Sequence, residues 1–311
     1  MILVTGGTGF IGQALLRHLV EAGNEVRTLI RPSKHSPNLP KGIPIEVAVS
    51  SLTDERGLRG AMVGVDTVYH LAGGEWAGPR SSLMEIDILG TQAVTRAAKD
   101  AGVSRIFYIS HLGADRASAY PVLKAKAIAE EYIRRSGVDY TIFRSAIVYG
   151  PQDGFTTGLA RLLSTIPFFL IPGDASTLLQ PLWIEDLVTC LVWSLDDTRT
   201  RNQTFEIGGP EYLTLPQIVE QVTHVMGIRR PLISIRPPYL RAFTVLIDHL
   251  FTNLPISVYW LDYLASNHTC SLDTLPHSFN LMPARLSQRL AYLEGKNWRR
   301  ALLKGLFLRH T

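Results

Sequence analysis

The stretch ILVTGGTGFIG, residues 2–12, decides the fold of this chain. Its first residues are apolar and predict a buried strand, and an amphipathic helix pattern follows directly. The glycines between them permit a tight turn, so that the first N–H groups of the helix can receive a pyrophosphate. This order of strand, glycine turn and helix predicts a dinucleotide site rather than a turn that serves packing alone. The expected contacts are Gly6, Thr8, Gly9, Phe10, Ile11 and Gly12.

The residue after the second strand indicates which dinucleotide binds. Arg31 ends an expected strand over residues 24–30, about twenty residues after Gly12, where the ribose-reading residue of such sites belongs. An acidic residue there would bind the 2′-hydroxyl of NAD, whereas an arginine can receive the 2′-phosphate of NADP. Arg31 and the nearby Lys34 therefore favour NADP(H), with NAD(H) as the other possibility. The alternative is a solvated basic loop.

Composition bounds the class of protein. The chain has 311 residues and a formal net charge of +4. Its two cysteines, Cys190 and Cys270, have neither metal-site nor disulfide-framework spacing, which fits the cytoplasm or an equivalent reducing compartment. The first strand begins at residue 2, so we expect no signal peptide, and no apolar run is long enough to predict a spanning helix. We expect no metal site, and no nucleic-acid partner because the body of the chain lacks a basic field.

The C-terminal residues 296–311 hold five basic and no acidic side chains. Within them, Trp298, Leu302 and Leu306 recur every four residues, which predicts a basic amphipathic helix. Such a helix can lie on an anionic membrane surface or a membrane protein complex. It can equally pack on its own domain, and the sequence leaves both interpretations open.

Strand and helix patterns alternate along the first half of the chain. Further strands are expected over 44–49, 66–71, 105–110 and 139–148, with helices over 10–22, 82–101 and 118–136. This alternation predicts an α/β fold, a doubly wound parallel sheet of the Rossmann type, with its ligand at the carboxyl ends of the strands.

The pattern loosens after residue 150. We therefore predict a dinucleotide-binding domain over 1–150, its sheet completed by about 180–208, and a smaller α-rich lobe over 151–311 that holds a substrate or partner. In this second half we expect a helix over 183–195, a strand over 204–207, and a capping box of Thr214 and Gln217 at the start of another helix.

Several motifs together resemble the short-chain dehydrogenase/reductase superfamily, in its extended and atypical branches, which include the epimerase/dehydratase-like proteins. Besides the glycine turn, they are HLAG at 70–73, YIS at 108–110, Arg144 with VYGP at 148–151, QPLWIED at 180–186 and FEIGGP at 205–210. Within the superfamily, the chain most resembles the group around the nucleotide-binding accessory subunit of respiratory complex I. The resemblance covers residues 1–227 and implies tightly held NADP(H), with or without turnover.

The resemblance assigns further cofactor contacts. Asp54 stands where the family reads the adenine amino group, although an ordinary helix N-cap is the other interpretation. Small residues at the end of a strand let the backbone approach the cofactor, and the resemblance implies this role for Leu71, Ala72 and Gly73. It also places Ser110 and Ser145 at the cofactor, where Ser145 replaces a proline common in the family.

Two registers compete for the catalytic position. In the superfamily, a tyrosine four residues before a lysine exchanges the substrate proton, and the lysine lowers the pKa of the tyrosine. Tyr120 and Lys124 satisfy this spacing. In the complex I-like group a lysine precedes a glutamate by four residues, as Lys126 precedes Glu130, and the tyrosine position then falls on Val122.

Other positions also depart from the family pattern. Leu112 replaces a serine or threonine, and Asp87 replaces an asparagine. His111 is a possible substitute proton donor, because its reference pKa lies near neutrality, or else a hydrogen-bonded histidine at a strand end.

These features support two hypotheses. One is an NADP(H)-binding accessory or assembly protein of a membrane redox complex. The other is an NADP(H)-dependent oxidoreductase or epimerase that acts on a carbonyl or hydroxyl substrate through Tyr120 and Lys124.

Overall fold

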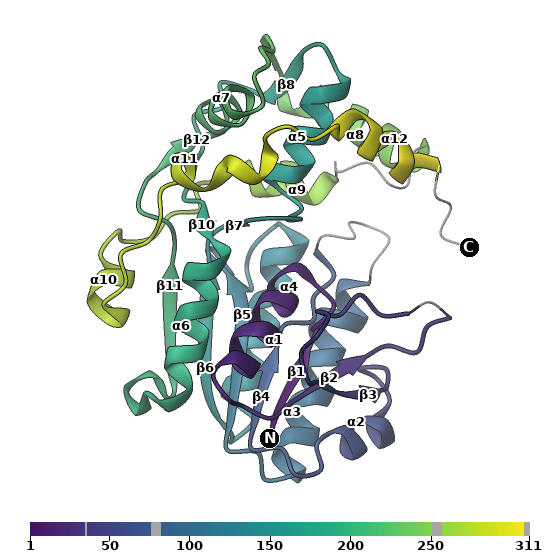
Figure 1. Ribbon diagram of the computed structural model, residues 1–311, viewed down its shortest axis with the longest axis vertical. Coiled ribbons are helices and arrows are strands. Elements are labelled where there is room, and N and C mark those ends of the chain that lie inside the picture. Colours follow the sequence, from purple (N-terminus) through teal and green to yellow (C-terminus); the bar gives the residue numbers. More distant parts are fainter. Residues whose placement is uncertain (35, 76–81, 251–256, 308–311) are drawn as a thin grey trace. The chain divides into compact units, whose positions relative to one another are not determined.

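The structure is a computed structural model that describes residues 1–34, 36–75, 82–250 and 257–307 (Figure 1). The chain forms two compact units. The first unit comprises Met1–Ser145 and Ile184–Ile207, and the second comprises Ala146–Trp183 and Gly208–Thr311. The chain thus leaves the first unit after Ser145 and returns to it for one helix and one strand.

A seven-stranded parallel sheet forms the centre of the first unit. Its strand order is β11-β6-β5-β4-β1-β2-β3, which contains the doubly wound order 3-2-1-4-5-6 and adds one strand at the edge. The predicted α/β fold is therefore confirmed. The strands are β1 (Ile2–Thr5), β2 (Val26–Ile30), β3 (Glu46–Val49), β4 (Thr67–His70), β5 (Arg105–His111), β6 (Asp139–Ser145) and β11 (Gln203–Ile207).

Helices cover both faces of this sheet (Figure 1). On one face α1 packs against α6, and on the other α3 packs against both α2 and α4. These helices are α1 (Phe10–Glu21), α2 (Glu55–Ala61), α3 (Gly90–Asp100), α4 (Pro121–Arg134) and α6 (Ile184–Asp196), with a π-helical turn η2 (Met84–Leu89) before α3 and a 3₁₀ turn η3 (Thr198–Thr200) after α6.

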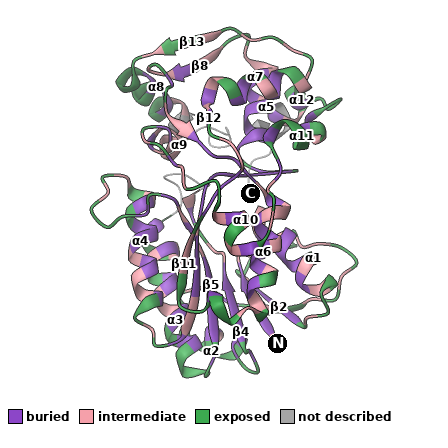
Figure 2. Cartoon of the chain, turned by 90° about the vertical axis from the view of Figure 1, so that its left-hand side faces the viewer, coloured by how far each residue is buried: buried purple, intermediate pink, exposed green. Residues whose placement is uncertain are grey.

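Buried aliphatic side chains hold the sheet to its helices. Leu3, Val68 and Ile106, on three neighbouring strands, are fully buried and pack with Leu58 of α2 and Val94 of α3. The central strands β1 and β4 are buried at every residue and β5 at nearly every residue (Figure 2), as in a parallel sheet that helices cover on both faces.

Two predicted elements of the first unit end differently in the structure. The helix expected over 82–101 is divided into the turn η2 and the helix α3. The strand expected over 139–148 ends at Ser145, because its neighbour β5 ends at His111, the residue that pairs with Ser145. The chain then enters the second unit and forms β7 (Val148–Tyr149).

The second unit is rich in helices, with short two-stranded pairings between them. Thr214 and Gln217 form the predicted capping box at the start of α7. Its helices are α5 (Thr156–Thr165), α7 (Leu215–Val225), α8 (Pro237–Leu250), α9 (Val258–Tyr263), α10 (Thr274–Phe279), α11 (Leu286–Arg289), the 3₁₀ turn η4 (Leu290–Leu293) and α12 (Trp298–Phe307). Its other strands are β8 (Phe169–Pro172), β9 (Leu178–Leu179), β10 (Leu182–Trp183), β12 (Leu213–Thr214) and β13 (Leu232–Ile235).

The C-terminal helix α12 packs on its own unit. Trp298 is buried in the apolar core there and donates a hydrogen bond from Nε1 to the Leu293 carbonyl at 2.9 Å, and Leu302 is buried as well. Arg299 and Arg300 are exposed, whereas residues 308–311 of the predicted helix lie outside the described residues. Among the described helices, none has both the length and the apolar character needed to cross a membrane.

Candidate nucleotide-binding site

The glycine turn joins β1 to α1 and brings two predicted sets of residues together. Gly6 has a φ of 75°, and a Cβ atom there would lie 2.7 Å from the backbone nitrogen of Ala72. A Cβ atom on Gly12 would lie 2.2 Å from the Gly6 carbonyl oxygen. Both contacts are shorter than real Cβ contacts, so these positions require glycine. The turn therefore lies directly against residues 71–72 at the end of β4.

The amino end of α1 is open to a ligand. The helix starts at Phe10 with Gly9 as its N-cap, and no side chain caps it. The first N–H groups of a helix have no partner within the helix, so those at residues 10–12 are available to an anion. Thr8 is exposed beside them.

Arg31 and Lys34 follow β2 directly. Both side chains are exposed, and neither has an ion-pair partner among the residues that the structure describes. Asp54 is the N-cap of α2, where its Oδ1 accepts hydrogen bonds from the N–H groups of Arg56 and Gly57, both at 3.1 Å. Its carboxylate therefore has the capping role, and the adenine contact stays a prediction.

A buried lysine lies at the carboxyl ends of the central strands. Lys126 of α4 is 4% exposed, and its Nζ lies 3.1 Å from Glu75 Oε2 and 3.2 Å from Asp87 Oδ1. Asp87 also accepts a hydrogen bond from the Gly74 N–H at 2.9 Å. A Cβ atom on Gly73 would lie 2.6 Å from Glu75 Oε2 and 3.0 Å from Lys126 Nζ, so the charged side chains lie directly against this turn.

The charges of this cluster shift one another's pKa values. Burial raises the pKa of Asp87 despite its contact with Lys126. Burial would also raise the pKa of Glu75, but Lys126 and His111 hold it below its ordinary value. Burial opposes the charge of Lys126, and the carboxylates nonetheless keep its pKa well above its ordinary value. The ammonium group is therefore charged at neutral pH and can donate hydrogen bonds.

Ser110 and His111 lie at the end of β5 in the same region. The Ser110 side chain is fully buried, and its Oγ has no hydrogen-bond partner among the described residues. His111 Nε2 lies 3.4 Å from Glu75 Oε1. Ser145, buried at the end of β6, pairs with His111 across the strands. A buried hydroxyl that makes no hydrogen bond is uncommon and indicates a position where a ligand can bind.

The two candidate lysines face in different directions. Lys124 is exposed, whereas Lys126 is buried in the cluster. Tyr120, one turn before Lys124, is the half-buried N-cap of α4. Val122 occupies the position one turn before Lys126. The structure thus gives the buried lysine no phenol one helical turn earlier.

Glu130 binds two arginines rather than Lys126, the lysine four residues before it. It is fully buried and accepts hydrogen bonds from Arg144 Nε and Nη2, both at 2.9 Å, and from Arg134 Nη2 at 2.8 Å. It therefore fixes α4 to β6 rather than neutralising Lys126.

Glu75 was not among the predicted site residues, and the buried His70 was named only as part of the HLAG motif. His70 contacts Thr5 Oγ1 at 2.7 Å and Thr91 Oγ1 at 2.9 Å, and burial with the nearby charge of Lys126 lowers its pKa to about 3. His70 therefore stays neutral and links β1 to α3. The available signal for Glu75 was an acidic residue two positions after the small-residue turn at Gly73.

Known proteins share both the sequence and the fold of the chain. A family model described as NAD(P)H-binding matches residues 6–162. The chain is 25% identical over 305 residues to the mitochondrial NADH dehydrogenase (ubiquinone) 1 alpha subcomplex subunit 9 of Arabidopsis thaliana, covering 90% of this chain and 75% of that protein. It is 29% identical over 252 residues to a putative dihydroflavonol 4-reductase of Synechocystis sp., covering 73% of each.

A solved structure has the same fold. The NADPH-dependent quinone oxidoreductase of Escherichia coli superposes with a TM-score of 0.72 at 19% identity, over 94% of this chain and 99% of that one. The resemblance to the atypical short-chain dehydrogenase/reductase superfamily, and to the complex I accessory subunit within it, is confirmed by these matches. The chain therefore belongs to the NAD(P)H-binding family, within this superfamily.

Proposed function

We propose that the first unit holds NADP(H) as a bound cofactor that is not turned over, and that the protein is an accessory or assembly component of a membrane redox complex. The observation that carries this proposal is that Val122, which cannot exchange a proton, occupies the position one helical turn before the buried Lys126, where the superfamily has its tyrosine.

The residues present fit a dinucleotide. Gly6 keeps the turn close to the end of β4, Gly12 keeps it close to α1, and the amino end of α1 has no side-chain cap where a pyrophosphate would bind. The buried Ser110 hydroxyl makes no hydrogen bond among the described residues. In this proposal Lys126 donates a hydrogen bond to a nicotinamide ribose hydroxyl, and Arg31 receives the 2′-phosphate of the adenosine half.

The absence of turnover follows from the proton path. When bound, the cofactor supplies a hydride, and reduction of a carbonyl also needs a proton donor within hydrogen-bond reach of the carbonyl oxygen. Valine cannot donate a proton, and Leu112 stands where the family has a hydroxyl. His111, one of the titratable groups of the region, has its Nε2 3.4 Å from Glu75 Oε1.

The role in a membrane complex is suggested by the similarity to the complex I subunit. The exposed Arg299 and Arg300 of α12 offer positive charge to an acidic partner surface. Because Trp298 and Leu302 are already buried in their own unit, this part of the helix favours a protein partner over insertion into a bilayer.

The first experiment measures cofactor identity in the full-length protein. Purified protein is denatured, and any nucleotide that it releases is identified by mass spectrometry, while calorimetry measures affinity for NADPH and NADH. Arg31→Ala should weaken NADPH binding by about 10- to 100-fold, as loss of a charged hydrogen bond requires, and leave NADH binding unchanged. Lys41→Ala, at another exposed basic residue, is the control. The proposal is contradicted if denaturation releases no nucleotide and calorimetry detects binding of neither NADPH nor NADH.

The second experiment tests the oxidoreductase alternative. This alternative is supported by the spacing of Tyr120 and Lys124 and by the similarity to a putative reductase. NADPH oxidation is followed with a panel of aldehydes, ketones and quinones. We expect no turnover above background. Turnover that is lost in Tyr120→Phe would establish the alternative, whereas turnover that persists in this variant would assign the proton to another group.

A further inference from the structure

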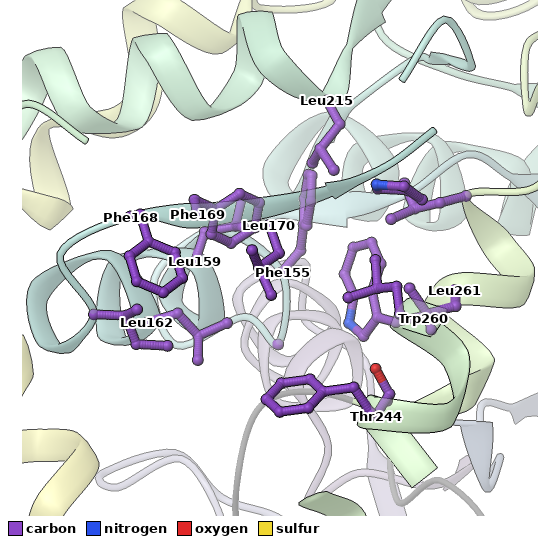
Figure 3. Close-up of a pocket in the computed structure, with 16 residues that line it drawn as sticks. Phe155, Leu159, Leu162, Phe168, Phe169, Leu170, Leu215, Thr244, Trp260 and Leu261 are labelled. Carbon is purple, nitrogen blue, oxygen red and sulfur yellow. The ribbon is translucent and has the colours of Figure 1, made fainter. Parts of the chain in front are cut away.

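A cavity of about 220 Å³ lies inside the second unit. Its wall comes from four helices, α5, α7, α8 and α9, and from the strand β8. Figure 3 shows the lining side chains around one space, with Leu162 and Phe168 on one side and Trp260 and Leu261 on the other. All lining residues belong to the second unit.

The lining is apolar almost throughout. None of the lining side chains carries a charge, and the polar ones are Thr244 and the indole of Trp260. A polar ligand placed here would lose its hydrogen bonds to water without replacement, which costs several kcal/mol per group. The cavity chemistry therefore selects a hydrocarbon.

The cavity has a buried floor and an exposed rim. Phe155, Leu159 and Leu162 of the floor are less than a tenth exposed, whereas Phe168 and Phe243 are 38% and 49% exposed. The apolar surface continues along α8, where Tyr239 and Leu246 lie one turn on either side of Phe243 and are 68% and 57% exposed. A ligand can thus enter at the rim and keep one end in solvent.

We propose that this cavity binds the hydrocarbon chain of a single-chain amphiphile, such as a fatty acid or lysolipid, with the polar headgroup outside the rim. An apolar cavity of about 150 Å³ accommodates benzene, so this one has room for roughly nine carbon atoms. The exposed aromatic side chains of the rim and α8 cover the part of the chain that leaves the cavity. This inference does not depend on the proposed function of the first unit.

The test uses full-length protein and the saturated fatty acids from hexanoate to dodecanoate, below their micelle concentrations, with calorimetry. Affinity should rise about fourfold for each added methylene, as burial of one such group predicts, and level off near ten carbons. Bromination of the chain end should quench tryptophan fluorescence, and Trp260→Phe should remove part of this quenching. No binding by any chain length would overturn the proposal.

Two variants of one floor residue keep the test independent of folding defects. Leu162→Trp fills the cavity and should weaken decanoate binding by at least 30-fold, with the thermal melting curve recorded alongside. Leu162→Ala enlarges the cavity and should move the levelling-off point to longer chains. Met282→Ser removes an apolar side chain that is 82% exposed outside the cavity and should bind like the wild type. Equal losses in Met282→Ser and Leu162→Trp would show non-specific surface binding and overturn the proposal.

An experiment with lipid vesicles distinguishes the two possible sources of the hydrocarbon chain, a membrane lipid and a free amphiphile. Co-sedimentation with phosphatidylcholine vesicles that is lost in Phe243→Ser supports a chain drawn from a membrane lipid. Binding of decanoate without co-sedimentation supports a free amphiphile. NADPH affinity measured on the same samples distinguishes the proposals, because the nucleotide should still bind to Leu162→Trp.

Discussion

Lys126 Nζ lies 3.1 Å from Glu75 Oε2 and 3.2 Å from Asp87 Oδ1, so one buried ammonium group is shared by two carboxylates. The three residues come from separate parts of the first unit and meet at Gly73, where all three side chains lie within 3.2 Å of the position that a Cβ atom would take. The arrangement holds a positive charge at the edge of the sheet where a doubly wound fold binds its ligand.

Replacement of Lys126 should strongly destabilise the protein. Lys126→Met removes the charge and leaves Glu75 and Asp87 buried without their partner, which should lower the free energy of unfolding by about 3–5 kcal/mol. Urea denaturation at pH 7, followed by circular dichroism, measures the loss. NADPH affinity should fall as well, if the ammonium group contacts the cofactor.

Lys124→Met is the matched control for this variant. Lys124 is exposed on the same helix, so its replacement should change stability by less than about 0.5 kcal/mol. Equal stability of the two variants would mean that the Lys126 ion pairs contribute nothing to folding. An effect of Lys124→Met on NADPH affinity but none of Lys126→Met would favour the Tyr120 register.

The glycine turn provides a second prediction. Gly12→Ala places a Cβ atom 2.2 Å from the Gly6 carbonyl oxygen, so the turn must shift away from its ligand-binding geometry. We expect a loss of NADPH affinity of at least 10-fold together with lower stability, as read by calorimetry and thermal melting. Gly60→Ala in α2 introduces a Cβ atom with nothing within 4 Å and should be neutral or stabilising by up to about 1 kcal/mol. Unchanged NADPH affinity in Gly12→Ala would show that the glycine turn does not contribute to nucleotide binding.

Local patterns predicted the parts of the molecule that depend on local physics. The glycine turn, the buried strands and the capping box of Thr214 and Gln217 each follow from neighbouring residues, and the structure has all three. The choice between Lys124 and Lys126 does not, because the two residues point to opposite sides of α4. Which side is buried depends on the packing of α4 against β5, and local sequence patterns are compatible with both registers.

Contacts between distant segments were beyond the sequence patterns. Glu75 joins the lysine cluster from a loop, and its partner Lys126 is about fifty residues away in the sequence. The apolar cavity is likewise assembled from segments that run from Gly154 to Leu264. Apolar residues in these segments are equally compatible with a solid core, so no local sequence signal distinguishes a cavity wall from close packing.

His18 and Glu185 give the first unit a pH-dependent contact. His18 Nε2 of α1 lies 2.6 Å from Glu185 Oε2 of α6, and this hydrogen bond raises the pKa of His18 above its ordinary value. A histidine whose pKa is raised by folding contributes its stabilisation fully below pH 6.5, and the contribution is lost as the pH rises through the raised pKa. Both side chains are partly exposed, so the contribution should stay below about 1 kcal/mol.

The measurement is the unfolding free energy at pH 6 and pH 9 for the wild type and Glu185→Gln. The loss between the two pH values should be smaller in the variant, because its amide no longer favours the charged imidazole. His277→Gln replaces an exposed histidine and should retain the wild-type loss. A variant with the full wild-type loss would exclude this pair as the source.

Arg105 is the most deeply buried arginine among the described residues of the first unit, and its replacement by lysine should not be conservative. Its side chain is 2% exposed, donates from Nη1 to the Ser194 carbonyl at 2.8 Å and from Nε to Thr141 Oγ1 at 3.1 Å, and lies 4.5 Å from the centre of the Phe107 ring. It thereby joins β5 and β6 to the end of α6. Lysine cannot make these planar, divergent hydrogen bonds, and the acceptors would remain buried.

We expect Arg105→Lys to lower the free energy of unfolding, measured by urea denaturation, by about 2–3 kcal/mol, because a buried acceptor without a hydrogen-bond partner has lost its solvation by water. Arg201→Lys, at an exposed arginine paired with Asp139 at 3.0 Å, should cost less than about 1 kcal/mol. Similar costs for the two would show that the Arg105 hydrogen bonds add nothing beyond an exposed ion pair.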